Sequence, residues 1–435
     1  MAIDNKDKKV LKSSIEREQN EVACSAECEK IKGSKNLNVP PLRFPEFTEE
    51  WRSHFLTDFM SFKNGMNPDA KRFGRGTKFI SVMDILNNQF ICYDNIRASV
   101  EVMDGDIDTY GVNYGDILFQ RSSETLEDVG QANVYLDSKP AIFGGFVIRG
   151  KSKGNYNPLF FRYLLASPTA RKRIIVKGAG AQHFNIGQDG LSKVSLDIPC
   201  MQEQKKIGEL LQCIDARIAT QNKIIEDLKK LKCAIIEKVL NGNNANNLRL
   251  GDVGSYIRGL TYSSDDVVEY NSTLVMRSNN IVNGSLLDYQ NNVVSVNKQI
   301  SQEQQLQDGD IIICMANGSS ALVGKSSFYD GKCISPITVG AFCGIYRSKT
   351  AITKWLFQTN RYRRYIWNSL QGGNGAIANL NSEDILRMSF PLPDKQTAER
   401  CIKLLSSLES LIESNISLYS KFFQQKEYLL RQMFI

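Results

Sequence analysis

The clearest hydrophobic pattern in the chain runs through residues 201–240, which contain no proline and a single glycine. Apolar residues recur there at alternating steps of three and four, which is the spacing of a coiled-coil seam. Residues 394–435 repeat the pattern. Each stretch predicts a helix about 60 Å long at 1.5 Å per residue. The predicted seam positions are Leu211, Ile214, Ile218, Gln221, Ile225, Leu228, Lys232, Ile235 and Val239, and then Leu405, Leu408, Ile412, Asn415, Tyr419, Phe422, Lys426, Leu429 and Met433.

The two seams are interrupted by polar residues at the same two places, Gln221 and Lys232 in the first helix and Asn415 and Lys426 in the second. Polar residues in a seam lower stability and fix register or orientation. Because the chain leaves the first helix, forms a whole domain and returns into the second, we expect the helices to pair antiparallel. Further apolar residues widen the face of the first helix, which predicts either docking of other subunits or packing on the chain's own domains: Ile207, Leu210, Ile224 and Leu231.

Outside these helices the pattern changes to short alternating or apolar runs separated by glycine and asparagine, which is typical of β-strands. Examples are residues 77–83, 116–119 and 141–148, and one helix is predicted over residues 158–176. Residues 1–38 are polar and mixed in charge, with no apolar period. We expect this lead to be mobile.

The whole plan occurs twice, because the chain aligns with itself after a shift of 194 positions. The pairs include Leu56 with Leu250, Gly115-Asp116-Ile117 with Gly309-Asp310-Ile311, and Pro199 with Pro393. The period is far longer than that of a solenoid repeat, so it indicates two whole domains of one kind. The predicted fold is α+β, with two tandem, pseudo-two-fold-related domains separated by two long helices that form an antiparallel coiled coil. The predicted parts are a lead (1–38), a first domain (39–200), a central helix (201–241), a second domain (242–393) and a C-terminal helix (394–435).

Composition and charge add little to this picture. The chain has 435 residues, 42% hydrophobic and 23% charged, as in ordinary globular proteins. A net charge of +7 permits an acidic partner such as DNA without requiring one. The ten cysteines are scattered and no signal-like or membrane-spanning run is found, so we expect reduced thiols and a cytoplasmic location.

The sequence offers no support for a catalytic or metal site. Its two histidines, His54 and His183, do not fall on histidines in the other half, and Cys24 and Cys28 have no second pair to complete four ligands. Residues 318–326 resemble a phosphate-binding loop, but five residues separate the glycines where four are required. The position that matches Lys325 is Gln131, so we interpret this segment as a turn.

Several motifs together resemble a known family. They are Leu42-Arg43-Phe44-Pro45-Glu46-Phe47 followed by Trp51, the repeated Gly-Asp-Ile entries, the turns at Asn185 and Asn379, and the helix starts after Pro199 and Pro393. In this order they resemble the specificity subunit of type I restriction-modification systems, over about residues 39–435. The Asn-Pro-Pro-aromatic motif of amino-methyltransferases and helicase-type ATP motifs are absent from the sequence.

The resemblance implies a non-catalytic protein that reads DNA. Each target-recognition domain would read one half of a bipartite, asymmetric double-stranded target, and the helices would set the gap between the halves. Two methyltransferase (modification) subunits would dock and bring S-adenosylmethionine. Restriction (motor-nuclease) subunits would add the chemistry that uses ATP and Mg, so no cofactor is expected in this chain itself.

Arginine can form paired hydrogen bonds with guanine, and asparagine or glutamine with adenine. Residues of these types in the loops of both domains are therefore candidates for DNA contact. The candidates for DNA contact in the first domain are Lys63, Asn64, Arg72, Arg75, Lys78, Arg121, Ser122, Ser123, Gln182 and Asn185. Those in the second domain are Arg258, Arg277, Asn279, Asn280, Asn317, Ser319, Ser320, Lys325, Asn374 and Asn379. The basic stretches 171–173 and 361–364 are predicted either to touch phosphate or to be exposed helix faces.

The loops differ more between the domains than the frames do, which predicts different half-sites and a non-palindromic target. Two other classes of function are open on the sequence. One is a coiled-coil scaffold whose duplicated domains bind protein, and the other is a self-contained modification enzyme.

Overall fold

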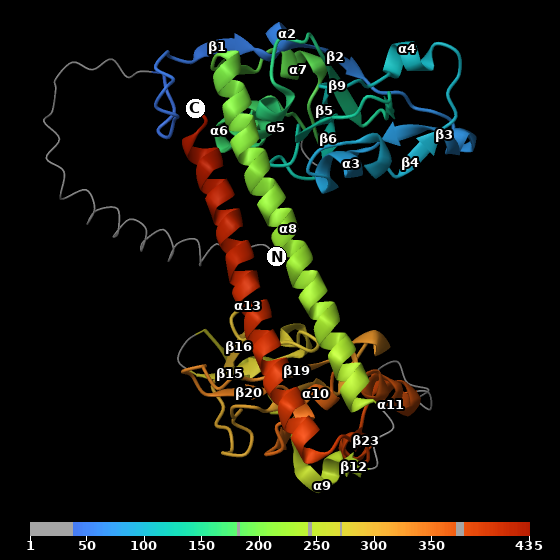
Figure 1. The fold of residues 1–435 in the computed structure, drawn as a ribbon, viewed down its shortest axis with the longest axis vertical. Helices are drawn as coiled ribbons and strands as arrows, with labels where there is room; N and C mark the ends of the chain where they lie inside the picture. The colour runs from blue at the N-terminus through green and yellow to red at the C-terminus, as the bar shows by residue number, and fades with distance from the viewer. Residues whose placement is uncertain (1–37, 181–182, 242–245, 270–271, 371–377) are drawn as a thin grey trace, which may run out of the picture. The chain divides into compact units, whose positions relative to one another are not determined.

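The computed structural model describes residues 38–180, 183–241, 246–269, 272–370 and 378–435 (Figure 1). The chain forms two compact units, one of Met1–Asp215 with Gln424–Ile435 and the other of Ala216–Phe423. We call them unit 1 and unit 2. Each contains one domain of mixed helix and strand and a part of both long helices. The predicted lead with Cys24 and Cys28, and the candidates Gln182 and Asn374, lie outside the described residues.

Unit 1 is built around two sheets. The larger has the strand order β2 (Met60–Asn64), β9 (Val147–Ser152), β5 (Ile117–Gln120) and β7 (Ala132–Val134), all antiparallel. The smaller has the order β4 (Ala98–Val100), β3 (Phe73–Ile80) and β8 (Ile142–Phe143), with β3 and β8 parallel. Two antiparallel ladders complete the strands: β1 (Arg52–Phe55) with β11 (Ser195–Ile198), and β6 (Ser122–Ser123) with β10 (Phe184–Asn185).

Unit 2 repeats this plan. Its antiparallel sheet has the order β13 (Gly254–Arg258), β21 (Cys343–Ser348), β17 (Ile311–Cys314) and β19 (Ser326–Phe328). Its second sheet has the order β14 (Val267–Val268), β16 (Val294–Val296), β15 (Thr273–Met276) and β20 (Ile337–Val339), with β15 and β20 parallel. The ladders are β12 (Asn246–Arg249) with β23 (Ser389–Leu392), and β18 (Ala316–Asn317) with β22 (Ala378–Asn379).

Short helices connect the strands of both units. Those of unit 1 are α2 (Leu56–Phe59), α3 (Val82–Asn87), α4 (Asp106–Tyr110), α5 (Pro158–Ala166), α6 (Pro168–Ile175) and α7 (Gln188–Ser192), with 3-10 turns η1 (Ala70–Arg72) and η2 (Tyr93–Asn95). Those of unit 2 are α9 (Leu250–Val253), α10 (Thr353–Leu356), α11 (Asn360–Leu370) and α12 (Ser382–Leu386), with 3-10 turns η3 (Ser264–Asp266), η4 (Ser278–Asn280) and η5 (Ser320–Leu322).

The repeated Gly-Asp-Ile motif forms the same turn at the start of β5 and β17. Gly115 and Gly309 have φ of 87° and 83°, a region that favours glycine. The following aspartate closes the turn, because Asp116 accepts the N–H of Asn113 at 3.0 Å and Asp310 accepts the N–H of Gln307 at 2.7 Å. The motif therefore fixes the entry into a central strand of the four-stranded antiparallel sheet of each unit.

Three predicted elements of the first domain differ from the observed ones. The helix predicted over 158–176 is two helices, because Ser167 caps α6 and Pro168 occupies its first turn, where its missing N–H costs nothing. The strand predicted over 141–148 is divided into β8 and β9 by a turn, and the one predicted over 77–83 ends at Ile80, before α3.

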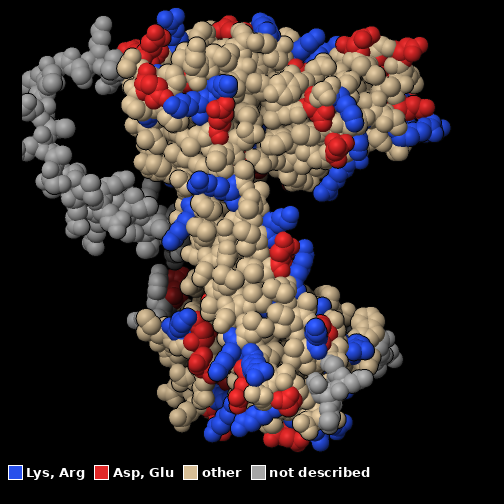
Figure 2. All heavy atoms as spheres, viewed as in Figure 1, with Lys and Arg blue, Asp and Glu red and all other residues tan. Residues whose placement is uncertain are grey.

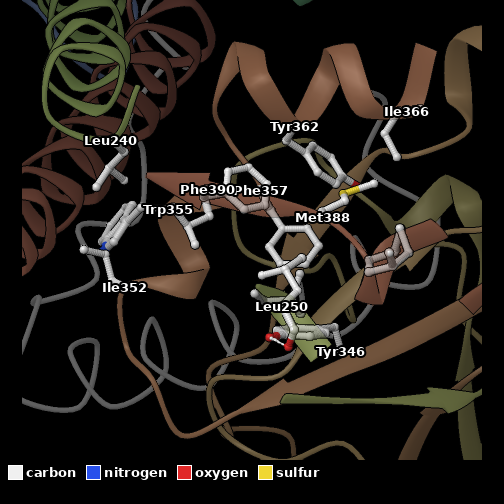
Figure 3. Packing of buried hydrophobic residues seen from close by; sticks show 14 of the residues in the cluster. Leu240, Leu250, Tyr346, Ile352, Trp355, Phe357, Tyr362, Ile366, Met388 and Phe390 are labelled. Carbon is white, nitrogen blue, oxygen red and sulfur yellow. Dashed lines mark hydrogen bonds between the residues drawn. The ribbon is translucent and has the colours of Figure 1, made fainter. Parts of the chain in front are cut away.

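The core of unit 2 gathers large side chains from α8 to β23 (Figure 3). Trp355, Tyr346 and Phe390 are fully buried there, and the hydroxyl of Tyr346 donates to the carbonyl of Leu250 at 2.9 Å. Leu240, the last residue of α8 (Met201–Leu240), lies near Trp355 in Figure 3. The long helix is thus anchored in this core.

The core of unit 1 contains residues far apart in the sequence. Trp51 and Phe434 are buried with their ring centroids 6.4 Å apart, and Phe434 lies 5.6 Å from Phe160. The N–H of Leu42 donates to the carbonyl of Gln432, the last residue of α13 (Lys395–Gln432), at 2.9 Å. Residues 424–435 therefore complete a core whose other members precede residue 216.

Helices α8 and α13 form the coiled coil that the period predicts, and they pair antiparallel as expected from the path of the chain. In unit 2 the amide of Gln221 donates to the side-chain oxygen of Asn415 at 2.6 Å, and Lys232 pairs with Glu409 at 3.3 Å. In unit 1 Lys426 pairs with Asp215 at 2.6 Å. The two ion pairs occupy positions that match each other after the shift of 194, so the polar interruptions of the seam meet charged or amide partners in both units.

The structure places every predicted seam residue at a buried or partly buried position. Near the end of α8, however, Ile236 and Leu240 are more deeply buried than the predicted Ile235 and Val239. The buried face rotates there by one residue because the helix leaves the seam and packs on the core of unit 2.

The apolar residues outside the seam separate into two groups. Ile207 is buried within unit 1, so packing on the chain's own domain accounts for it, and Leu210 is partly buried. Ile224 and Leu231 are exposed on α8. Among the described residues no helix combines the length and the apolar character needed to cross a membrane.

Candidate nucleic-acid interface

The ladders β6–β10 and β18–β22 bring together candidate residues that are about sixty positions apart in the sequence. In the first domain Asn185 stands opposite Ser122, and in the second Asn379 stands opposite Ala316. Each ladder begins immediately after a central strand of the four-stranded antiparallel sheet, β5 or β17. Both domains therefore present short polar side chains from the same place in the fold, on a two-stranded antiparallel ladder.

In the first domain this group consists of Arg121, Ser122, Ser123 and Asn185. The hydroxyl of Ser122 bonds the side-chain oxygen of Asn185, and the guanidinium of Arg121 donates to the carbonyl of Gly145 at 3.3 Å. Asn185 is exposed and the other three are partly exposed. Hydroxyl, amide and guanidinium groups at one edge can act as donors and acceptors toward bases or phosphates.

In the second domain the group is Asn317, Ser319, Ser320 and Asn379. The amide of Asn317 donates to the hydroxyl of Ser278 at 3.2 Å and its oxygen accepts the N–H of Ser319 at 3.0 Å. Ser319, Ser320 and Asn379 are exposed. This domain thus presents amides and hydroxyls where the first domain presents an arginine and two serines.

Other candidates lie apart from the ladders. Lys63 and Asn64 end β2, and Arg258 ends the equivalent strand β13, where it is exposed. Arg277 and Asn279 are exposed around η4, and Lys325 precedes β19. They belong to the same domains, but no hydrogen bond in the described residues links them to the ladder groups.

The structure gives several candidates a structural role. Arg72 is largely buried and donates to the carboxylate of Asp106 at 2.5 Å. Together with the N–H of Met103, this contact holds the pKa of Asp106 below its ordinary value. The amine of Lys78 donates to the carbonyl of Ile96 at 2.7 Å, and Arg75 pairs with Glu101 at 2.7 Å on the surface.

Asn280 is also structural. It is 1% exposed, its oxygen accepts the N–H of Arg277, and its amide donates to the carbonyls of Asp288 and Asn291 at 3.0 and 2.8 Å. The side-chain oxygen and nitrogen of Asn280, which were predicted to contact a base, thus bond to backbone groups of the domain itself. Its neighbour Asn279 is exposed.

The basic helix stretches are likewise partly engaged within their domains. Arg171 donates to the carbonyls of Glu127 and Val129, Arg173 pairs with Asp197, and Arg361 donates to the carbonyl of Ser389. Lys172, Arg363 and Arg364 remain exposed. Figure 2 shows basic and acidic side chains interspersed on the face in view, so charge alone does not mark a nucleic-acid surface there.

The segment that resembles a phosphate-binding loop is a turn around η5, with the N–H of Lys325 donating to the carbonyl of Leu322. His54 lies 3.4 Å from Asp58 on the surface, and His183 is exposed. Within the described parts of the chain, no group of three or more histidine, cysteine or acidic side chains is arranged to hold a metal ion.

Two residues beside the ladders lie outside the predicted set, the exposed Phe146 and Phe342. The segments Gly144-Gly145-Phe146 and Gly340-Ala341-Phe342 match with a shift of 196 instead of 194. The second domain has two more residues before this point, so the shift of 194 does not align Phe146 with Phe342. The glycine that lies two positions before each phenylalanine is the sequence signal that could have identified the pair.

Comparison with known proteins identifies the family. The chain matches the family described as "Type I restriction modification DNA specificity domain" twice, over residues 48–230 and 243–418. It is 23% identical over 406 residues to the MjaX type I restriction enzyme specificity subunit assigned in Methanocaldococcus jannaschii, covering 87% of this chain and 91% of the relative. It is 22% identical over 328 residues to the StySPI specificity subunit of Salmonella potsdam, covering 69% and 70%.

The fold agrees with this assignment. A solved type I restriction-modification S subunit from M. genitalium superposes with a TM-score of 0.54 at 14% identity, covering 91% of this chain and 99% of that one. Specificity subunits of these systems are not catalytic, and the chemistry lies in their partner subunits. With two matched copies that together span most of its length, the chain belongs to the family of type I restriction-modification DNA specificity subunits.

Proposed function

We propose that each recognition domain reads one half of a bipartite, asymmetric double-stranded DNA target. The observation that carries this proposal is the polar ladder that occurs twice with different side chains. Arg121, Ser122 and Ser123 in one domain stand where Met315, Ala316 and Asn317 stand in the other. The two domains share the fold around the ladder but carry different hydrogen-bond donors and acceptors on it. This arrangement suits two domains that recognise different bases.

The coiled coil offers a surface for the modification subunits. Ile224 and Leu231 on α8 directly precede seam residues, as do Leu404, Leu411 and Leu418 on α13, and all five are exposed. In an antiparallel pair the positions that precede the seam fall on the same side of both helices. These residues therefore form one exposed apolar face within unit 2, which we call the g face.

We propose that two methyltransferase subunits dock on the coiled coil and that apolar helices are the natural partners for the g face. Burial of exposed aliphatic side chains would supply the free energy of docking. In this scheme S-adenosylmethionine, ATP and Mg are held by the modification and restriction subunits. The complex would act in the cytoplasm, and the role of this chain is to bind DNA and to position the subunits.

Binding of random duplexes by the full chain, alone and with a modification subunit, tests the proposal. We expect selection of two different short motifs at a fixed gap, and an affinity that falls steeply with salt as counterions are released. Methylome sequencing of a host that expresses both subunits should find methylated adenines in the same two motifs. A chain that assembles modification subunits but selects no motif would be a scaffold, and methyl transfer by the chain alone would make it an enzyme.

A further inference from the structure

Each recognition domain presents one phenylalanine to solvent from an equivalent tight turn. Phe146 is 69% exposed and Phe342 is 66% exposed. Each is the third residue of a β-turn: the N–H of Val147 donates to the carbonyl of Gly144 at 2.9 Å, and the N–H of Cys343 donates to that of Gly340 at 2.8 Å. The turns lead from β8 into β9 and from β20 into β21.

Both turns are also contacted closely by a glycine that directly follows β2 or β13. A Cβ added at Gly65 would lie 2.0 Å from the carbonyl oxygen of Gly144, and one added at Gly259 would lie 2.2 Å from that of Gly340. No side chain fits between strand and turn in either domain. The exposure of the two rings therefore does not come from a loose loop.

The backbone of each phenylalanine is also tied to the start of the polar ladder. The carbonyl of Phe146 accepts the N–H of Arg121 at 2.9 Å. The carbonyl of Phe342 accepts the N–H groups of Met315 and Ala316 at 2.9 and 3.1 Å. Each phenylalanine is thus joined through its backbone to the first residues of the ladder proposed to read DNA, and the Arg121 guanidinium donates to the carbonyl of Gly145 within the turn.

A single exposed aromatic side chain on a protein surface is common and has no meaning by itself. Here the same side chain occupies the same turn in two domains whose adjacent ladder residues differ. An exposed ring on a turn that is bonded to the ladder adds an apolar group to the hydrogen-bonding groups of the same domain. Proteins that read DNA use this combination, with apolar side chains against thymine methyl groups or between base steps.

We propose that Phe146 and Phe342 each pack against the bases of one half-site and contribute to its affinity and specificity. The inference rests on the proposed function, because it assigns the apolar contact of the same DNA interface. In the first domain Phe146 also borders an apolar groove of about 370 Å³ lined by Met66, Phe73, Phe79 and Met83. The exposed ring occurs in both domains, so a contact that the two rings share is better explained by DNA than by a peptide bound in this groove of the first domain.

The test uses the full chain with its modification subunit and the target found by selection from random duplexes. We expect Phe146→Ala to weaken binding about 5- to 150-fold, the range found when one base-stacking side chain is removed, and to relax selection in one half-site only. Phe342→Ala should do the same in the other half-site. Phe146→Tyr, which keeps the ring, should remain near the wild-type affinity.

Two exposed apolar residues away from the turns serve as matched controls, Met103 (60% exposed) in the first domain and Ile334 (102% exposed) in the second. Met103→Ala and Ile334→Ala should leave both half-sites unchanged. The inference is overturned if both phenylalanine variants keep wild-type affinity and selection, or if they bind DNA normally but lose the modification subunit. If the unsubstituted complex selects no motif, the proposed function fails first and this inference fails with it.

Discussion

At the scale of single residues, the type of side chain does not distinguish a residue that could contact DNA from one that stabilises the fold. Asn279 and Asn280 are adjacent and chemically identical, yet only Asn279 is exposed. The partners of Asn280 are backbone groups up to eleven positions away, brought close by the turn after η4. Their approach depends on the tertiary fold, so no local pattern could have revealed that this amide is occupied.

We expect Asn280→Ala to lower the free energy of unfolding of unit 2 by about 1–3 kcal/mol, because two carbonyls and one N–H lose the hydrogen bonds that the buried amide makes. Asn279→Ala is the matched control and should change the stability by no more than about 0.5 kcal/mol. Urea denaturation of the two variants measures the difference. Equal stability of the two variants would show that the buried amide contributes little.

At the scale of elements, the long helices follow from the sequence because a heptad period is a local signal repeated many times. The period places Gln221 and Asn415 in the seam, and they meet there. The break at Ser167 also had a local signal, since Pro168 suits the first turn of a new helix. The turn at residues 144–147 was hidden because apolar residues flank it on both sides. The ladders, which join residues distant in the sequence, could not be predicted from spacing alone.

The ion pair of Asp215 and Lys426 should show strong coupling. Asp215 is buried and accepts the hydroxyl of Tyr163 at 2.8 Å as well as the amine of Lys426. Lys426→Met leaves a buried carboxylate without its cation, and we expect a loss of about 3–5 kcal/mol in the free energy of unfolding. The double variant Asp215→Asn with Lys426→Met removes both charges and should recover part of this loss. A double-mutant cycle measures the coupling, and additive effects would contradict it.

The g face should matter for assembly and not for folding. Leu411→Glu and Leu418→Glu replace exposed side chains, so we expect the thermal unfolding of the free chain to change little. Association with the modification subunit should weaken at least about tenfold if these leucines are buried there. Ser407→Glu, on an exposed position of the same helix outside this face, is the control. Unchanged association of both leucine variants in analytical ultracentrifugation would exclude the g face as a docking surface.

At the scale of the whole molecule, duplication separates recognition into two independent parts. Replacement of residues 248–393 by the corresponding domain of another family member should change one half of the target and leave the other intact. The polar ladder and the turn of the first domain are built entirely from residues 64–185, so they are not altered by the exchange. Selection from random duplexes provides the measurement. A change in both halves would show that the domains do not read separately.

Insertion of seven residues into both α8 and α13 keeps the heptad register and lengthens each helix by about 10 Å. Under the proposed function the gap between the half-sites should increase by about three base pairs, at 3.4 Å per pair. Methylome sequencing detects the new spacing. An unchanged gap would show that the helices do not determine the spacing.

The contact of Phe434 with Trp51 has a consequence for biosynthesis. Unit 2 is continuous in sequence, so it can fold as soon as residue 423 has left the ribosome. Unit 1 cannot close its core until residue 434 is available, which is roughly 10–40 s after Asp215 has been translated, at about 5–20 residues per second. During that interval Trp51 and Phe160 lack the ring of Phe434 that packs against both of them, and a nascent chain interrupted by a late stop codon would never gain it. Quality control by chaperones and proteases should therefore act on the first domain when the lesion lies in the last dozen codons.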